Sequence, residues 1–278
     1  MSDAAAATAL QDPGAPAPVL AFDTSTERLA VALQAGERSF TRLAEGGAAA
    51  SAALLPLVQA LLAEAGVTLR ELGTIAFGRG PGAFTGLRTA CAVAQGLGFG
   101  LAKPLLPVDS LLIVAEDARR QASGEANDRP FDVLVAMDAR MDEAYVGRYR
   151  WQPQAGAAGG GHWQVSQAPA LVALPTLAAW GTALVDGPGA EAPVVAGSAL
   201  AAFGERLALP PACPRIAQEH DRAAALLRLA VAAAARGECV DAADALPLYL
   251  RDKVALTTAE RDAARAAKSA AAAAPATP

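Results

Sequence analysis

A glycine-rich segment after a short apolar run is the most site-like part of the sequence. Residues 80–88 read Gly-Pro-Gly-Ala-Phe-Thr-Gly-Leu-Arg, between the apolar run Thr74–Phe77 and a stretch rich in small residues at 86–103. A strand, a glycine turn and a helix start can aim backbone N–H groups and the positive end of a helix dipole at an anion. The candidate ligand contacts here are Gly80, Gly82, Thr85 and Arg88. Any tight turn between a strand and a helix uses the same residue types, so a purely structural role is equally consistent.

The glycine segment fails both common nucleotide motifs. A P-loop needs Lys followed by Ser or Thr after its last glycine, whereas Gly86 is followed by Leu87 and Arg88. In the dinucleotide fingerprint Gly-x-Gly-x-x-Gly the third glycine would replace Thr85, but here it comes one residue later. The segment is neither a Walker loop nor a good dinucleotide site.

A second polar cluster, Asp138, Arg140 and Glu143, follows an apolar run in the middle of the chain. Two carboxylates beside an arginine could have separated pKa values and act as an acid and a base. No nucleophile or metal ligand accompanies them in the sequence. In the glycine segment, Arg88 has two alternatives of its own, because an arginine can bind a phosphate or pair with a carboxylate. We favour a salt-bridged turn or an interface patch for residues 138–143.

Composition limits the classes of function. The chain has 278 residues and a formal net charge of −5, which argues against a sequence-wide electrostatic footprint for nucleic acid. The three cysteines are far apart, and the two histidines, His162 and His220, complete no metal-ligand spacing with them. No basic leader precedes an apolar segment, and no run of eighteen consecutive apolar residues occurs. We expect a soluble cytoplasmic protein with buried free thiols and no membrane partner.

Two halves of the chain show the same succession of elements. The first half predicts three strands at Val19–Asp23, Leu29–Leu33 and Arg38–Leu43, then a helix at Ser51–Ala65. A fourth strand at Thr74–Phe77, the glycine turn and a second helix within 86–103 follow. The second half follows a loop at Arg119–Arg129 with two strands, a flexible tip, a helix, a strand and a last helix, at Val133–Met137, Ala144–Tyr149, Gln154–Gly161, Thr176–Thr182, Ala192–Ala196 and Asp221–Arg236.

This repetition predicts an α/β protein with the two-lobed, duplicated plan of the actin, sugar-kinase and Hsp70 ATPases (the ASKHA fold). We expect an amino-terminal lobe at 19–112 and a carboxy-terminal lobe at 113–251, whose terminal helix packs back on the first lobe. Residues 1–18 are predicted to be a disordered tail, and 252–278 an Ala-rich tail. Ligands of such folds bind in the cleft between the lobes.

Because the proteins that share this plan bind ATP, we ask whether Asp23, Thr24 and Ser25, at the end of the first strand, contact a nucleotide. Asp23 could meet a metal-bound phosphate, as the carboxylate at this place does in sugar-kinase-like ATPases. Asp and Thr after a strand also form Asx-turns and Ser/Thr-turns. We favour the turn.

Four motifs together resemble the TsaB family, also called YeaZ, of bacterial tRNA threonylcarbamoyladenosine biosynthesis proteins. They are Asp23-Thr24-Ser25-Thr26, the segment at 80–88, Asp138-Ala139-Arg140-Met141 with Glu143 and Tyr145, and Pro247 with Tyr249-Leu250-Arg251. The similarity runs from about residue 19 to residue 251. The four motifs in this order identify the family far more specifically than any one of them does.

The resemblance implies an accessory role. TsaB proteins assemble with the related catalytic subunit TsaD and the ATPase TsaE. The complex transfers threonylcarbamoyl from its adenylate to the adenosine 3′ of the anticodon in tRNAs that read codons beginning with A. TsaB and TsaD pair largely through their amino-terminal lobes, and a homodimer is expected without TsaD. The resemblance places ATP or ADP only at the assembled complex, and tRNA only in indirect contact.

The resemblance implies that one of two helices, at 51–65 or within 86–103, presents an apolar face to TsaD or to a second copy of this chain. Packing within the lobe is the alternative for both. The residues proposed for this face are Leu54, Leu55, Val58, Ala90 and Ala94.

The metal site of the catalytic relative is missing. TsaD holds a metal with a His-x-x-x-His pair on the helix after the first meander, whereas residues 48–56 contain no histidine. Ser51 stands where many TsaB proteins have one. We therefore expect neither a metal site nor catalytic residues. The competing hypothesis is an independent ATP-binding hydrolase or kinase, motivated by Asp23 and the glycine turn. Proteolysis has little support, since no Ser/His/Asp or Cys/His set is recognisable.

Overall fold

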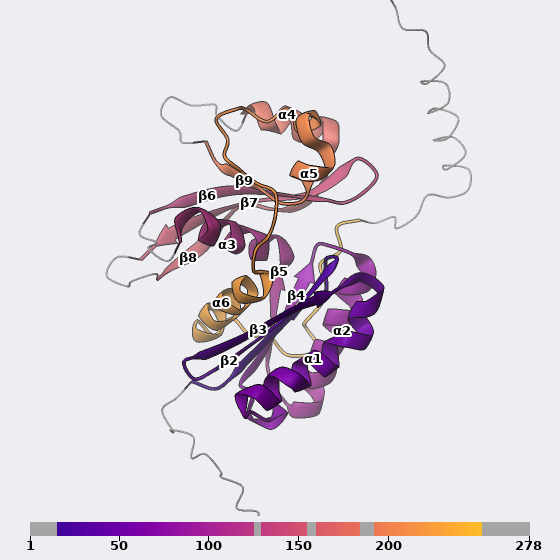
Figure 1. Ribbon diagram of the computed structural model, residues 1–278, viewed down its shortest axis with the longest axis vertical. Helices are drawn as coiled ribbons and strands as arrows, with labels where there is room; N and C mark the ends of the chain where they lie inside the picture. Colours follow the sequence, from indigo (N-terminus) through magenta and orange to yellow (C-terminus); the bar gives the residue numbers. More distant parts are fainter. Residues whose placement is uncertain (1–15, 125–128, 155–159, 184–191, 252–278) are drawn as a thin grey trace, which may run out of the picture. The chain divides into compact units, whose positions relative to one another are not determined.

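A computed structural model of the chain describes residues 16–124, 129–154, 160–183 and 192–251. Residues up to Leu248 form one compact unit that contains two five-stranded sheets (Figure 1). Most of the predicted tails, and the centre of the predicted tip at 154–161, lie outside the described residues.

The first sheet has the strand order β3-β2-β1-β4-β5. Its strands are β1 (Val19–Asp23), β2 (Arg28–Ala35), β3 (Arg38–Glu45), β4 (Thr74–Gly80) and β5 (Leu105–Asp109). The first three form an antiparallel meander, and β4 and β5 add in parallel to β1. The meander and the strand before the glycine turn confirm the sequence prediction. β5 was not predicted, because Pro107 and the short length weaken its pattern.

Side chains of β1 alternate between the two faces of this sheet. Leu20 and Phe22 belong to a cluster with α1 (Ala50–Ala65) and α2 (Phe84–Leu101), whereas Val19 and Ala21 belong to a cluster with α6 (Arg222–Ala235). Successive residues of a strand point to opposite faces, so a fully buried strand reads as one apolar run. Figure 1 shows α1 and α2 on one face of the sheet and α6 on the other.

Helix α1 ends at the predicted stop, Gly66, whose φ is 71°. Together with the preceding turn, its residues Gly47–Ala65 are long and apolar enough to cross a membrane, with a mean hydropathy of 1.6. Leu54, Val58, Leu61 and Leu62 of this segment are packed in the first-lobe core. We therefore interpret it as a core helix.

The second sheet repeats the topology of the first, with the order β8-β7-β6-β9-β10. Its strands are β6 (Phe131–Asp138), β7 (Glu143–Pro153), β8 (Gly161–Ala173), β9 (Val194–Ala196) and β10 (Arg215–Ile216). β6, β7 and β8 again form an antiparallel meander, and β9 and β10 again add in parallel. The chain therefore has the two-lobed, duplicated ASKHA plan that the sequence predicted.

Helices cover both faces of the second sheet. Helix α3 (Ser110–Ser123) packs on one face, and α4 (Leu174–Ala183) and α5 (Ala199–Phe203) on the other. The prediction of a loop at Arg119–Arg129 was wrong at its start, because α3 continues to Ser123 and buries Arg119. The predicted lobe boundary between residues 112 and 113 falls inside this helix.

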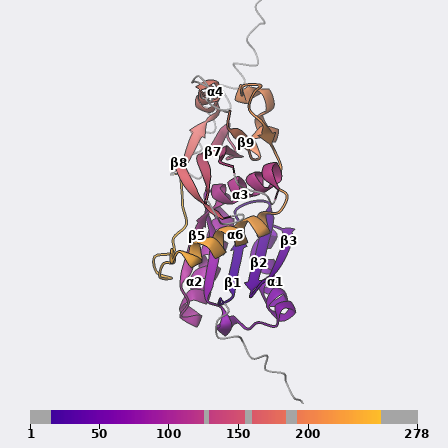
Figure 2. The ribbon, with the colours of Figure 1, turned by 90° about the vertical axis from the view of Figure 1, so that its left-hand side faces the viewer.

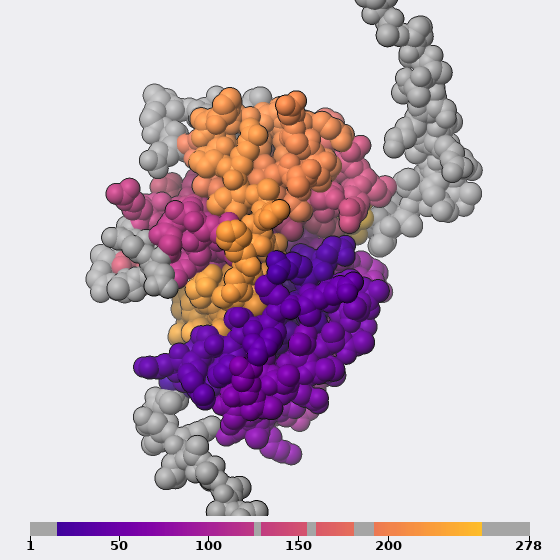
Figure 3. Space-filling model, in the orientation of Figure 1, coloured from indigo at the N-terminus to yellow at the C-terminus, as the bar shows by residue number. Residues whose placement is uncertain are grey.

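Helix α6 lies against both α3 and the first sheet, so it joins the end of the chain to its beginning (Figure 2). Its inner face is mostly alanine, and it meets Ala21, Ala30, Ala32 and Ala76 of the sheet. Small side chains on both sides allow helix and sheet to approach closely. In Figure 3 the gold surface of α6 adjoins the indigo surface of the first strands.

Candidate functional site

The turn after β1 is closed by its own side chains. Asp23 Oδ1 accepts hydrogen bonds from the backbone N–H of Ser25 at 2.6 Å and from Ser25 Oγ at 2.7 Å. Thr24 Oγ1 donates to the carbonyl of Gly86 at 2.6 Å, across 62 residues of sequence. Asp23 and Thr24 are fully buried and Ser25 is 3% exposed. This is the Asx-turn geometry that the sequence favoured over a phosphate contact.

Arg222, the first residue of α6, completes the environment of Asp23. Its Nη2 lies 3.3 Å from Asp23 Oδ2 and donates to Ser25 Oγ at 3.0 Å. Ser110 Oγ donates to the same carboxylate oxygen at 3.0 Å. Burial alone would raise the pKa of Asp23, but the charge of Arg222 and the hydrogen bonds from Ser25 outweigh it and hold that pKa below its usual range. Asp23 is therefore a buried, paired carboxylate.

The glycines pack against this turn. A Cβ atom at Gly78 would lie 1.7 Å from Asp23 Oδ2, one at Gly86 would lie 1.8 Å from the Thr24 carbonyl oxygen, and one at Gly82 would lie 2.5 Å from the Ser25 carbonyl oxygen. The absence of a side chain thus lets two chain segments approach closely. The glycine segment therefore packs directly on the turn at 23–25.

Of the other residues proposed around the glycine turn, Gly80 is linked to the carboxylate through Ser110, whereas Thr85 and Arg88 are not in contact with it. Gly80, with φ of 110°, donates its N–H to Ser110 Oγ at 3.1 Å. Thr85 and Arg88 are exposed on the first turns of α2, and the Arg88 guanidinium stacks over the ring of Phe84 at 3.8 Å. The structure thus brings Asp23, Thr24, Ser25 and Gly82 together and leaves Thr85 and Arg88 on the surface.

The turn between β6 and β7 is the counterpart of the Asp23 turn in the second sheet. Asp138 accepts the backbone N–H of Arg140 at 2.8 Å, and the Arg140 guanidinium lies 3.3 Å from its other oxygen. Arg140, Met141 and Asp142 all have positive φ, and the chain returns into β7 at Glu143, whose N–H donates to the Arg140 carbonyl at 3.1 Å. Arg140 also lies 3.7 Å from Glu27 of the first hairpin, where both side chains are largely exposed. The arrangement is a salt-bridged turn.

The Asp23 turn does not fit a nucleotide phosphate. Both carboxylate oxygens already accept hydrogen bonds from Ser25, Ser110 and Arg222, and the side chain has no solvent exposure. A phosphate-bound cation could reach Asp23 only if α6 and the glycine turn both moved. Among the described residues no group of three or more His, Cys, Asp or Glu side chains could hold a metal ion.

The face proposed for a partner needs correction. Leu54, Val58, Ala90 and Ala94 are at most 1% exposed and belong to the first-lobe core, because these helices turn their apolar stripe to the sheet. Only Leu55 among the five proposed residues is on the surface, with 44% exposure. Of the proposed residues, only Leu55 can belong to an exposed seam on α1 and α2, together with residues that were not proposed, such as the 66% exposed Phe99.

Sequence reasoning missed three residues of this site: Arg222, Ser110 and Gly78. Arg222 lies 199 residues from Asp23, so no local pattern links them. The signal available in the sequence was an Asp221-Arg222 pair at the start of a helix, where a cationic side chain is less common than an acidic one.

Comparisons with known proteins assign the chain to a family. The family model TsaD, described as tRNA N6-adenosine threonylcarbamoyltransferase, matches residues 47–257. A structure of YeaZ from Pseudomonas aeruginosa is 38% identical, with a TM-score of 0.69, and the match covers 84% of this chain and all of that one. The chain belongs to the TsaB (YeaZ) family.

Curated TsaB proteins give the same result for part of the chain. TsaB from Haemophilus influenzae is 40% identical over 129 residues, which is 46% of this chain and 51% of that protein. TsaB from Escherichia coli is 36% identical over 132 residues, 48% of this chain and 54% of that protein. The chain thus spans about half the length of the curated TsaB relatives that it matches. A second P. aeruginosa structure, described as similar to peptidase YEAZ, has a TM-score of 0.70 at 38% identity and covers 85% of this chain and all of that one.

Proposed function

We propose that this chain is a non-catalytic accessory subunit in the biosynthesis of threonylcarbamoyladenosine in tRNA. It works with TsaD and TsaE in the transfer of threonylcarbamoyl from its adenylate to the adenosine 3′ of the anticodon. The names of its TsaB relatives and the match to the TsaD family model support the pathway. One observation carries the non-catalytic part of the proposal, namely the closed Asp23 turn.

The closed turn supports a structural role because it removes the group that would act on nucleotide. Asp23 is 0% exposed and paired with Arg222, and the glycine turn packs on residues 23–25. In the same lobe, the helix that carries the metal-binding histidines in TsaD has Ala, Ser, Leu and Pro between residues 48 and 56. The chain therefore retains the scaffold of the fold, while the chemistry belongs to the partner. In this proposal ATP or ADP binds only at the assembled complex, tRNA contacts the chain only indirectly, and the protein is cytoplasmic.

The proposed partner surface is the exposed side of α1 and α2 in the amino-terminal lobe. Leu55 on α1 and Phe99 on α2 are large apolar side chains with 44% and 66% exposure. The exposed positions Ala92 and Gly96 of α2 carry a methyl group and no side chain, respectively, which allows a partner helix to approach closely. In the absence of TsaD the same surface pairs two copies of this chain.

The partnership is tested by size-exclusion chromatography with light scattering, on the full chain with and without purified TsaD. The proposal expects the mass of a homodimer for the chain alone and the mass of a one-to-one complex after TsaD is added. Separate elution of the two proteins at micromolar concentrations would contradict it.

The alternative is an independent ATP-binding hydrolase or kinase of the same fold. Only the location of Asp23 after the first strand favours it, and the pairing of that carboxylate with Arg222 speaks against it.

A further inference from the structure

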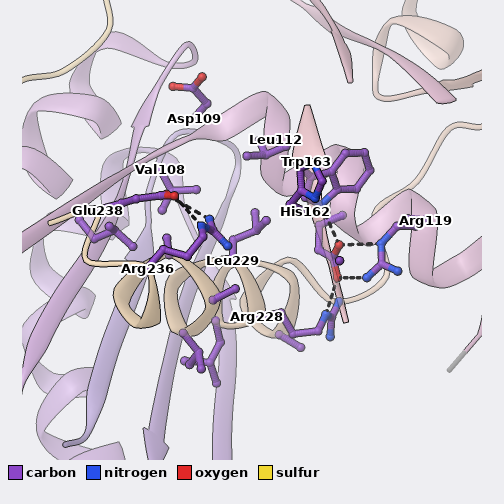
Figure 4. Close-up of a pocket in the computed structure, with 18 of the residues that line it drawn as sticks. Val108, Asp109, Leu112, Arg119, His162, Trp163, Arg228, Leu229, Arg236 and Glu238 are labelled. Carbon is purple, nitrogen blue, oxygen red and sulfur yellow. Dashed lines mark hydrogen bonds and ion pairs between the residues drawn. The ribbon is translucent and has the colours of Figure 1, made fainter. Parts of the chain in front are cut away.

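A pocket of about 850 Å³ lies away from the turns at Asp23 and Asp138 (Figure 4). Its walls come from the β2–β3 hairpin, the ends of β4 and β5, helix α3, the start of β8 and helix α6. This volume is in the range of pockets that enclose small organic molecules. The proposed accessory role assigns no task to these residues.

The pocket has an apolar wall with a rigid aromatic ring. Val108, Leu112 and Leu229 supply aliphatic surface, and Trp163 on β8 lies beside them (Figure 4). The indole Nε1 of Trp163 donates to Glu116 Oε2 at 3.1 Å, and its ring meets that of Trp151 edge to face at 5.6 Å. These contacts fix the ring, so a flat ligand can pack against it without a further loss of side-chain freedom.

One carboxylate in this pocket serves two arginines. Glu116, whose side chain is 2% exposed, accepts Arg119 Nε and Nη2, both at 2.8 Å, and Arg228 Nε at 2.7 Å. The described lining residues comprise four arginines against three carboxylates. Arg79 pairs with Asp109, and Arg236 pairs with Glu238. The pocket's one unbalanced positive charge therefore belongs to the cluster in which Arg119 and Arg228 share the single carboxylate of Glu116.

Arg228 is the arginine of this cluster that can reach a ligand. Arg119 is 4% exposed at its side chain and uses two nitrogens on Glu116, whereas the Arg228 side chain is 36% exposed and uses only Nε. No hydrogen bond joins its two terminal nitrogens to another residue in the described part of the chain. Figure 4 shows Arg228 extending from α6 below Trp163 and His162. A planar guanidinium edge with two free N–H groups matches a carboxylate or a phosphate.

We propose that this pocket binds a small organic anion with a flat or apolar body. Arg228 binds the carboxylate or phosphate, and the body packs against Trp163, Leu112 and Val108. Glu116 holds Arg228 and Trp163 in place for this contact. The site is independent of the partner surface on α1 and α2.

The test compares two anions with their neutral counterparts by isothermal titration calorimetry on the full chain. AMP with adenosine reports on a phosphate, and indole-3-carboxylate with indole reports on a carboxylate. We expect at least one anion to bind about tenfold or more tightly than its neutral counterpart. The substitution Arg228→Gln should remove that difference, and Arg228→Lys should restore part of it. The control Arg236→Gln, on the pocket rim and already paired with Glu238, should leave the binding unchanged.

A second readout separates this pocket from any other binding site. The chain has three tryptophans, and in an NMR spectrum of the indole N–H groups the anion should shift the signal of Trp163 more than that of Trp180. Circular dichroism of Arg228→Gln establishes that the variant is folded. Equal binding of anion and neutral counterpart, no saturable binding of either anion, or unchanged binding in folded Arg228→Gln would each overturn the proposal.

Discussion

Arg222 Nη2 lies 3.3 Å from Asp23 Oδ2 in the interior of the protein, although the two residues are 199 positions apart. The pair joins the last described helix to the end of the first strand. A buried charge without a partner is strongly destabilising, and Arg222 is the ionic partner of Asp23, whereas Arg222 also pairs with Glu219. The contact holds the start of α6 against the turn after β1.

Removal of the carboxylate charge should destabilise the protein. In Asp23→Asn, Arg222 stays buried with Glu219 as its remaining ionic partner. We expect the free energy of unfolding to fall by about 3 kcal/mol or more, measured by urea denaturation at pH 7. The control is Asp142→Asn, which breaks the exposed pair with Arg206 and should cost less than about 1 kcal/mol. Equal effects of the two substitutions would contradict the assignment of Asp23 as a buried paired charge.

The same pair predicts a dependence of stability on pH. Because the pKa of Asp23 is lowered in the folded state, the unfolded chain binds the proton more readily. The stability that Asp23 contributes is complete above about pH 4, the ordinary range of an Asp pKa, and is lost as the pH falls through the lowered folded value. The difference in unfolding free energy between the unmodified protein and Asp23→Asn should therefore shrink from pH 7 to pH 3. A constant difference would count against the ion pair.

The glycine turn provides a test of close packing. In Gly86→Ala the new Cβ would lie 1.8 Å from the Thr24 carbonyl oxygen, so the helix start or the Asp23 turn must move. We expect a loss of about 3 kcal/mol or more of unfolding free energy. Gly96→Ala is the matched control in the same helix, because nothing lies within 4 Å of its Cβ. It should raise stability by about 0.5–1 kcal/mol. A stable Gly86→Ala protein would mean that the turn leaves room for a ligand.

Nucleotide binding separates the two functional hypotheses. With Asp23 paired and the glycines in contact with residues 23–25, ATP or ADP with magnesium should give no saturable heat with the chain alone. Isothermal titration calorimetry measures this directly. Micromolar binding that disappears in Asp23→Ala would instead favour the hydrolase or kinase alternative.

The partner surface predicts an effect of exposed apolar side chains. Leu55→Glu and Phe99→Glu each place a charge on the exposed side of α1 or α2, and each should weaken pairing with TsaD about tenfold or more. Val165→Glu changes a 50% exposed apolar residue of β8 in the second lobe and should leave pairing unchanged. Loss of pairing in Val165→Glu alone would move the interface to the other lobe.

The sequence allowed the prediction of those parts of the fold that have local signals. The β1–β3 meander, helix α1 with its Gly66 stop and the glycine turn follow from periodicity and turn residues. Helix α3 was partly mistaken for a loop, because Glu116, Asp117, Arg119 and Arg120 make its second half look solvated. Glu116 and Arg119 are in fact buried by pairing with each other. Charged residues can enter a core in this way, and only the tertiary structure reveals their partners.

The candidate site shows the same limit. The sequence marked Asp23 and the glycines, and the interpretation of an Asx-turn agrees with the geometry. It could not supply Arg222 or Ser110, since contacts across 199 and 87 residues leave no local pattern. The apolar stripe of α1 and α2 was assigned to a partner, although four of its five proposed residues are core. A periodic apolar face indicates that a helix surface is buried, but it does not tell whether the protein's own sheet or a partner protein covers that surface.

The central claim is that the chain supports a reaction whose catalytic groups belong to its partner. The most direct measurement is the initial rate of threonylcarbamoyl transfer to tRNA, with the chain alone, with TsaD and TsaE alone, and with all three proteins. We predict no transfer by the chain alone and a strong increase when it is added to TsaD and TsaE. Transfer by the chain alone, or an unchanged rate in the complete mixture, would contradict the account.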